Sequence, residues 1–106
     1  MSDMPKMTEK QLQASIVRMA KQLGYLCYHT TYSIGSERGF PDLVIVGHGA
    51  CWMIECKGPR GRVSEEQEAW IAQLQLAGID ALIVYPDDLD MVLTDLMEMY
   101  ERRHAA

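Results

Sequence analysis

The stretch PDLVIVGHGACWMIECK, Pro41–Lys57, is the most informative part of the chain, because it holds two apolar runs separated by Gly-His-Gly. Two such runs around a short glycine-containing turn are typical of a β-hairpin. Carboxylates occupy the outer ends of the runs at Asp42 and Glu55, and Lys57 follows. A buried hairpin does not require charged residues at these positions, so they need a separate explanation.

The position of the turn predicts the register of the hairpin. Antiparallel strands around a tight turn pair residues whose numbers have a constant sum. A turn centred between two residues, His48 and Gly49, predicts the pairs Val46–Cys51, Val44–Met53 and Asp42–Glu55. Because strand side chains alternate with period two, both carboxylates lie on one face, and Lys57 shares it. A β-bulge would shift this pairing.

The opposed carboxylates indicate a metal site. Two acids facing each other across a sheet repel and destabilise it. A divalent cation between them converts the repulsion into binding, and oxygen ligands suit Mg²⁺ or Mn²⁺. Either acid alone is more simply explained as a solvated strand end. The combination of Asp42, Glu55 and Lys57 on one face favours the metal site.

Helices and strands are predicted on both sides of the hairpin. Thr8 and Ser64 are each followed three residues later by glutamine, which is a capping-box signature at a helix start. The expected order is a helix after Thr8, strands at 25–30, 42–46 and 51–57, a helix after Ser64, a strand at 81–85 and a helix from Asp87 or Asp88. This order predicts an α/β fold with a mixed sheet flanked by helices.

Two further polar residues fall on the predicted inward stripes of helices. Glu9 precedes Leu12 by three positions and Ile16 by seven, and Gln67 stands in the same relation to the apolar residues of its own helix. First helical turns also favour polar residues, and Gln67 is explained equally well as the third position of a capping box. A site shared with the two acids is the alternative, and it favours Glu9 more than Gln67.

Length and composition predict one domain that spans residues 1–106. The hydrophobic fraction of 48% and the charged fraction of 24% are ordinary for a globular chain. No apolar run approaches the roughly 18 residues of a membrane helix, and no signal-peptide pattern is present, so a cytoplasmic protein without membrane contact is expected. The odd number of cysteines, all in strand-like runs, predicts buried free thiols and argues against a zinc site.

Charge is divided unevenly along the chain. The net charge is −5, yet residues 1–62 carry eight Lys/Arg against five Asp/Glu, and residues 63–106 carry two against ten. The first segment is therefore able to face a polyanion, while the second faces water or a protein partner.

Taken together, GFPDL, IECKGPRGRVSEEQEAW and LQLAGIDALIVY resemble the PD-(D/E)XK nuclease superfamily, and more narrowly its VRR-NUC family of virus-type replication-repair nucleases. The resemblance also includes Glu9 in TEKQLQ and runs from about residue 8 to residue 85. Cys56 departs from it, since a larger aliphatic residue is more usual there. The resemblance implies a restriction-endonuclease-like αβββαβ core over about 8–85 with an additional C-terminal helix over about 88–103.

The same resemblance implies a set of metal ligands. Asp42, Glu55 and the backbone carbonyl of Cys56 would hold Mg²⁺ or Mn²⁺, and Glu9 would contact the ion directly or through water. Because only the carbonyl of Cys56 takes part, its unusual side chain does not change the implied set of metal ligands.

Roles for the remaining polar residues also follow from the resemblance. Lys57 would orient or activate the attacking water, or stabilise the pentavalent phosphate, and Gln67 would fix Lys57 or a water. Independently of the resemblance, phosphate contacts are predicted for the loop arginines that flank the site, Arg38, Arg60 and Arg62. Ordinary loop solubility is the alternative, and nearness to the acid pair favours phosphate contacts.

The resemblance thus implies a metal-dependent, structure-selective DNA endonuclease that leaves a 5′-phosphate. A Holliday-junction-resolvase-like homodimer acting on branched DNA fits best, because cutting two strands requires two sites. Surplus apolar residues predict a partner surface on the last helix, namely Met91, Met97, Met99 and Tyr100. The alternatives are a flap or splayed-arm nuclease, an RNA- or tRNA-directed nuclease, and a catalytically silent DNA-binding or scaffold domain. The expected location is cytoplasmic, in the host if the chain is viral.

Overall fold

A computed structural model describes residues 6–30 and 37–105. The elements, in chain order, are α1 (Glu9–Gln22), β1 (Leu26–His29), β2 (Leu43–Gly47), β3 (Ala50–Cys56), α2 (Glu65–Leu76), β4 (Asp80–Val84), the short 3₁₀ helix η1 (Pro86–Asp88) and α3 (Leu89–His104). The predicted order is confirmed, and so is the α/β class with a C-terminal helix added to the αβββαβ core. No described helix is long and apolar enough to cross a bilayer.

The four strands form one mixed sheet in the order β1-β2-β3-β4, in which β1, β2 and β3 are antiparallel and β4 runs parallel to β3. The predicted pairs Val44–Met53 and Val46–Cys51 are confirmed. His48 and Gly49 form the turn with φ values of 50° and 80°. Two consecutive positive φ values are those of a type I′ turn, whose twist matches that of the strands it joins.

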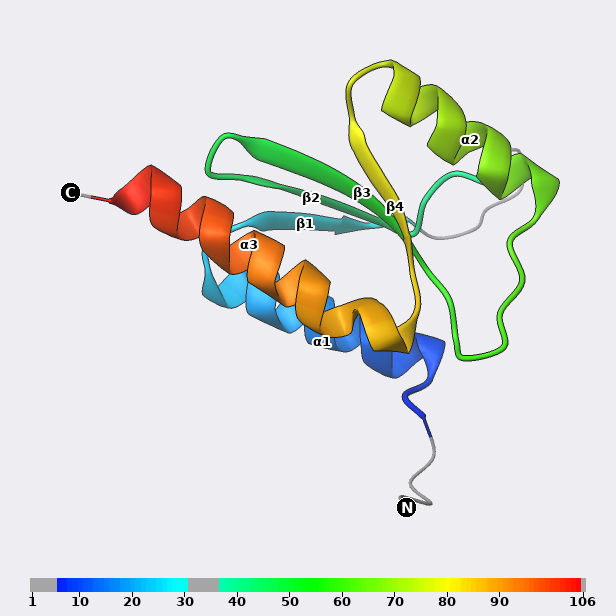
Figure 1. The fold of residues 1–106 in the computed structure, drawn as a ribbon, viewed down its shortest axis with the longest axis horizontal. Helices are drawn as coiled ribbons and strands as arrows, with labels where there is room; N and C mark the ends of the chain where they lie inside the picture. Colours follow the sequence, from blue (N-terminus) through cyan, green and yellow to red (C-terminus); the bar gives the residue numbers. More distant parts are fainter. Residues whose placement is uncertain (1–5, 31–36, 106) are drawn as a thin grey trace.

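Helices cover the two faces of the sheet unequally. Figure 1 shows α1 and α3 packed along one face, while α2 lies over the other face beside β4. The core lies between the sheet and the α1–α3 pair, and its fully buried side chains include Leu12, Ile16, Leu43, Ile45, Ile54 and Leu96. The alternate residues of β2 and β3 therefore face α2, and Glu55 is among them.

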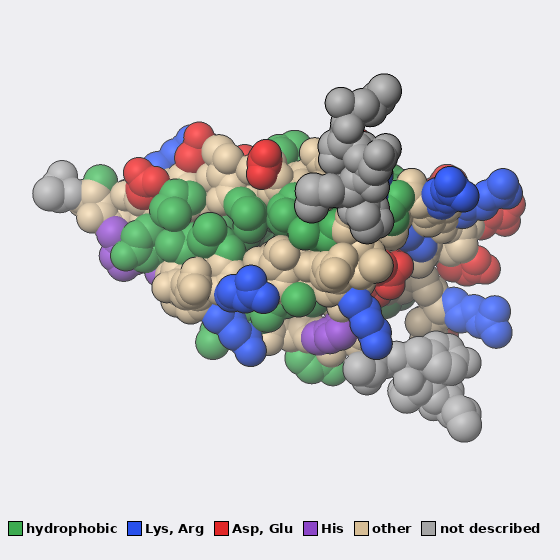
Figure 2. Space-filling model, turned by 90° about the horizontal axis from the view of Figure 1, so that it is seen from below, with side chains coloured by type: hydrophobic (Ala, Val, Ile, Leu, Met, Phe, Trp, Pro, Cys, Tyr) green, Lys and Arg blue, Asp and Glu red, His purple; other side chains and the backbone are tan. Residues whose placement is uncertain are grey.

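The helix starts follow the sequence prediction closely. Both capping boxes are formed, one by Thr8 with Gln11 and the other by Ser64 with Gln67. All three cysteines are free, as expected, but only Cys56 is buried, so the expected burial is wrong for Cys27 and Cys51, which are partly exposed. On the face that carries α1 and α3, Figure 2 shows acidic side chains above the left part of a hydrophobic band and basic side chains below it, with both kinds mixed at the right-hand end. The uneven charge of the sequence is thus also uneven in space.

Candidate active site

Asp42 is anchored at the entrance to β2 by backbone contacts. Its Oδ2 accepts a hydrogen bond from the backbone N–H of Cys56 at 3.0 Å. Its carbonyl oxygen accepts bonds from the backbone N–H of Thr30 at 2.8 Å and the Thr30 hydroxyl at 3.1 Å. The predicted pair Asp42–Glu55 is not part of the ladder, whose last pair is Leu43–Ile54, so Asp42 lies just outside β2. The contact with Cys56 nevertheless holds its carboxylate against the end of β3.

Glu55 is the buried carboxylate of the site, with only 4% of its surface exposed. Its Oε2 accepts a hydrogen bond from Gln67 Nε2 at 2.9 Å and lies 3.6 Å from Lys57 Nζ. Its Oε1 is buried and accepts no hydrogen bond from any described group. A buried carboxylate oxygen without a partner is costly, so this atom is well suited to bind a ligand.

Burial raises the pKa of Glu55 from 4.5 to about 7, with a further increase from the nearby charge of Asp42 and an opposing effect of Lys57. The repulsion between Asp42 and Glu55 agrees with the sequence prediction that two carboxylates meet here. Burial also raises the pKa of the Cys56 thiol to about 12, helped by the charges of Asp42 and Glu55. The thiol stays protonated at neutral pH, which leaves the Cys56 carbonyl as the group able to bind a cation.

This donor set fits a hard divalent cation. Asp42 and the orphaned Oε1 of Glu55 supply carboxylate oxygens, and the Cys56 carbonyl is adjacent in the chain. Oxygen ligands with two negative charges suit Mg²⁺ or Mn²⁺. Within the part of the chain that the structure describes, no three His, Cys, Asp or Glu side chains converge on one metal position. The site therefore consists of a carboxylate pair, completed by backbone oxygen or water.

Glu9 is exposed at the first residue of α1, although it lies on the same helical stripe as the buried Leu12 and Ile16. Glu9 still lies at the border of the site, because a β-carbon added to Gly58 would be 3.6 Å from the Glu9 backbone nitrogen. Its charge also contributes to the raised pKa of the Cys56 thiol. A contact to a metal through water remains the prediction for this residue.

Gln67 combines the two roles that its position in the sequence allows. Its Oε1 accepts a hydrogen bond from the backbone N–H of Ser64 at 3.0 Å, which completes the capping box. Its Nε2 donates to Glu55, as described above. The capping interaction therefore orients the amide that stabilises one oxygen of the buried carboxylate.

We expect Gln67→Glu to keep the α2 cap but to disturb the site. Glutamate is a good capping-box residue, yet it cannot donate to Glu55 and adds a repelling charge. Cleavage should fall about tenfold or more, whereas the midpoint of urea unfolding changes little. Gln11→Glu is the matched control, because Gln11 makes the same capping box on α1 without a recorded contact to either acid. Equal activity in the two variants would contradict a role for Gln67 in the site.

The segment that leads into Asp42 is held on α2. The indole N–H of Trp70 donates to the carbonyl of Arg38 at 3.0 Å. The rings of Phe40 and Trp70 meet edge to face with centroids 5.1 Å apart. Arg38 itself is exposed, so its guanidinium is free to meet a ligand beside the site. The sequence did not predict these contacts, because Phe40 and Trp70 are far apart along the chain.

A second loop surrounds Lys57. The Tyr85 hydroxyl donates to the carbonyl of Gly61 at 3.1 Å, and a β-carbon added to Gly61 would lie 3.0 Å from Lys57 Cβ. Arg60 and Arg62 on this loop are exposed. The structure thus places the predicted arginines on two loops that border the carboxylates. Tyr85 and Thr30 are positioning residues that sequence reasoning missed, since nothing in their local pattern distinguishes them from ordinary strand ends.

The metal-free protein should become less stable as pH rises from about 5 to about 8. The folded-state pKa of Glu55 is raised to about 7 above its ordinary 4.5, so between these values the unfolded state binds fewer protons than the folded state. Stability therefore decreases with pH across this window. Thermal unfolding in a chelator at several pH values measures the slope, and Glu55→Gln should flatten it. An unchanged slope in that variant would assign the effect to other groups.

Comparison with known proteins supports a family assignment. The sequence model of the VRR-NUC domain matches residues 1–87. A solved VRR_NUC domain is 21% identical, with a TM-score of 0.69, and the alignment covers 83% of this chain and 97% of the other. A second solved structure, a VRR_NUC domain protein, is 21% identical with a TM-score of 0.70 over 90% of this chain and 92% of the other. No curated protein matches. The chain therefore belongs to the VRR-NUC family of nuclease domains.

Proposed function

We propose that this protein is a metal-dependent, structure-selective DNA endonuclease that hydrolyses phosphodiester bonds. The observation that carries the proposal is the buried Glu55 carboxylate, which has one oxygen bound by Gln67 and the other without a partner beside Asp42. A DNA-binding scaffold gains nothing from two carboxylates near a phosphate, because they repel it. When a cation is bound, the same two carboxylates hold it in place beside the phosphate.

Asp42, Glu55 and the Cys56 carbonyl are proposed to hold Mg²⁺ or Mn²⁺. When bound, the ion would offset charge on the phosphate and lower the pKa of a water molecule. Lys57 keeps its ammonium 3.6 Å from Glu55 and is only 9% exposed. From there it would orient the attacking water or stabilise the phosphate oxygens, so that hydrolysis leaves a 5′-phosphate on the product.

Arg38, Arg60 and Arg62 are proposed to contact the DNA backbone. All three are exposed on the loops that border the carboxylates. Phosphate contacts of this kind give binding that weakens steeply with salt and carries no base preference. The choice of substrate would then come from the shape of the DNA, as expected for an enzyme that acts on branches.

A homodimer is proposed to form through the part of the sheet that α2 leaves uncovered, over β1 and β2 on the face opposite α1 and α3. The three exposed side chains Leu26, Tyr28 and Val46 have 75%, 65% and 41% of their surfaces accessible. The register places Leu26 beside Val46 and Tyr28 beside Val44, so these residues form one apolar patch. Clustered exposed apolar residues are characteristic of interfaces.

The location of this patch leaves the carboxylates accessible. Along the strand direction, Val46 lies four residues beyond Asp42, about 13 Å, and Tyr28 lies beside Val44, two residues beyond Asp42, about 7 Å. A two-fold contact over the patch would therefore give a particle with two open sites, as paired incision requires.

The predicted dimer surface on α3 has less support. Met99 packs against the core, and the Tyr100 ring meets His48 with centroids 5.1 Å apart. Met97 is half-buried, while Met91 is 49% exposed. Most of the apolar surface of α3 is thus used within the protomer.

The proposed activity is tested by incubating the protein with labelled four-way junction, flap, splayed-arm and duplex DNA, and with a matching RNA, in Mg²⁺ or Mn²⁺. Preferential, metal-dependent cutting of the four-way junction is the expected result. Preference for a flap or splayed arm would replace the resolvase assignment, and preference for RNA would replace the DNA assignment. Absence of cutting on every substrate with either metal would favour a scaffold domain.

The dimer is tested by light scattering. Leu26→Glu should convert a dimer into a monomer, because it places a charge in the apolar patch. Leu76→Glu is the matched control, since Leu76 is 81% exposed at the end of α2, away from the patch. A monomeric wild-type protein, or a Leu26→Glu variant that remains dimeric, would exclude this interface.

A further inference from the structure

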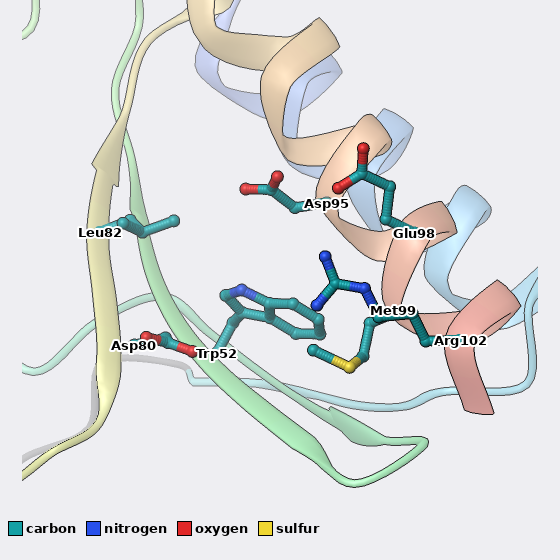
Figure 3. A pocket seen from close by; sticks show the side chains of 7 residues that line it. All are labelled: Trp52, Asp80, Leu82, Asp95, Glu98, Met99 and Arg102. Atoms are coloured by element: carbon teal, nitrogen blue, oxygen red, sulfur yellow. The ribbon is translucent and has the colours of Figure 1, made fainter.

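A cavity of about 260 Å³ lies between β4 and α3, apart from the candidate active site. Its apolar lining comes from Trp52, Leu82 and Met99 (Figure 3). Trp52 and Glu55 are three residues apart on one strand, so their side chains point to opposite faces of the sheet. A ligand in this cavity would therefore leave the carboxylate site free.

Trp52 brings an unused hydrogen-bond donor to the cavity. Only 7% of its surface is exposed, and no described group accepts a hydrogen bond from its indole N–H. The other indole, that of Trp70, donates to a carbonyl at 3.0 Å. Figure 3 shows the Trp52 nitrogen facing the gap between Leu82 on β4 and Asp95 on α3. This N–H is not among the fully buried polar atoms without a partner, so it opens into the cavity and is available to a ligand with an acceptor oxygen.

Charge identifies the second requirement of the ligand. Three carboxylates line the cavity, those of Asp80, Asp95 and Glu98, whereas Arg102 is the single basic residue in the lining. Among the described residues, Arg102 forms no ion pair within 4.0 Å of these acids. In Figure 3 its guanidinium lies beside the indole ring, on the side of the α3 carboxylates. The cavity thus has an excess of negative charge that repels nucleic acid and attracts a cation.

We propose that this cavity is a docking site for an arginine side chain of a partner protein. A guanidinium stacks on an indole ring and pairs with carboxylates in a fixed geometry, and the backbone carbonyl of the same residue would accept the Trp52 N–H. The volume is below the range of about 300–1,000 Å³ typical of drug-sized ligands, so it suits a single side chain. Arginine is also the charged residue most enriched at the centres of protein interfaces.

The test follows the Trp52 indole N–H by proton–nitrogen correlation NMR while N-acetyl-arginine methylamide is added. A saturable shift of this signal is expected, and the citrulline analogue, which has the same shape without the charge, should cause little change. Asp95→Asn combined with Glu98→Gln should weaken binding about tenfold or more. Glu101→Gln is the matched control, because Glu101 is exposed on α3 and does not line the cavity.

Several results would overturn the proposal. These are the absence of a shift with the arginine amide, an equal shift with the citrulline amide, and unchanged binding in the double variant. A response to spermidine alone would identify a polyamine site instead. Because both substituted acids are on the helix surface, the backbone spectrum should show a folded protein. DNA cleavage by the double variant should match that of the wild type, which separates this proposal from the proposed nuclease activity.

Discussion

Lys57→Met should reduce metal-dependent DNA cleavage by about 10²- to 10³-fold, the range found when one group that stabilises transition-state charge is removed. The ammonium of Lys57 lies 3.6 Å from Glu55 Oε2 and is almost fully buried. Methionine retains most of the buried aliphatic chain, so packing against the Gly61 loop is preserved. The change therefore removes the positive charge from the proposed position of the scissile phosphate, and rates under single-turnover conditions would measure its effect.

Metal binding distinguishes the role of Lys57 from that of the carboxylates. Lys57→Met should still bind Mn²⁺ in a calorimetric titration, whereas Asp42→Asn should lose both binding and cleavage. Lys21→Met is the matched control, because Lys21 is exposed in the last turn of α1. Wild-type cleavage by Lys57→Met would refute the proposed mechanism, and so would wild-type cleavage by Asp42→Asn.

Gly39→Ala should destabilise the protein by about 3 kcal/mol and also lower cleavage. Gly39 has a φ of +94°, where a side chain costs about 1–2 kcal/mol. An added β-carbon would also lie 2.5 Å from the carbonyl carbon and 2.6 Å from the carbonyl oxygen of Glu66 in the first turn of α2. Relieving such a clash costs about 1–3 kcal/mol more. Since Gln67 is the next residue, a shift of α2 would loosen its hydrogen bond to Glu55.

Gly78→Ala provides a close control for this prediction. Gly78 has a φ of +86°, but an added β-carbon would meet nothing within 4 Å. The Gly78→Ala variant should therefore lose only the conformational contribution to stability, about 1–2 kcal/mol, and keep full activity. Urea unfolding measures both variants. Equal losses of stability in the two variants would contradict the predicted clash between the added β-carbon at Gly39 and α2.

The hairpin could be predicted in detail because its information is local. A two-residue turn sets the register of both strands, and the alternation of side chains then assigns every residue to a face. Capping boxes at Thr8 and Ser64 likewise depend on residues three positions apart, and both are present in the structure. The metal-site hypothesis for Asp42 and Glu55 followed from this register alone.

Glu9 shows where local patterns fail. Its spacing from Leu12 and Ile16 matches the inward stripe, and those two residues are buried. Glu9, in the first turn of α1, is nevertheless exposed. Helical periodicity assigns a direction to a side chain and cannot say whether another element covers it.

The order of elements, the hairpin register and the prediction that two acids and a lysine meet were encoded in short-range sequence, since turn geometry and strand alternation act between near neighbours. Tertiary packing alone produced the rest. It brought Gln67 to Glu55, left Glu55 Oε1 without a partner, and opened the acidic cavity beside Trp52. These features join segments from distant parts of the chain, and their distances depend on how α2 and α3 pack on the sheet.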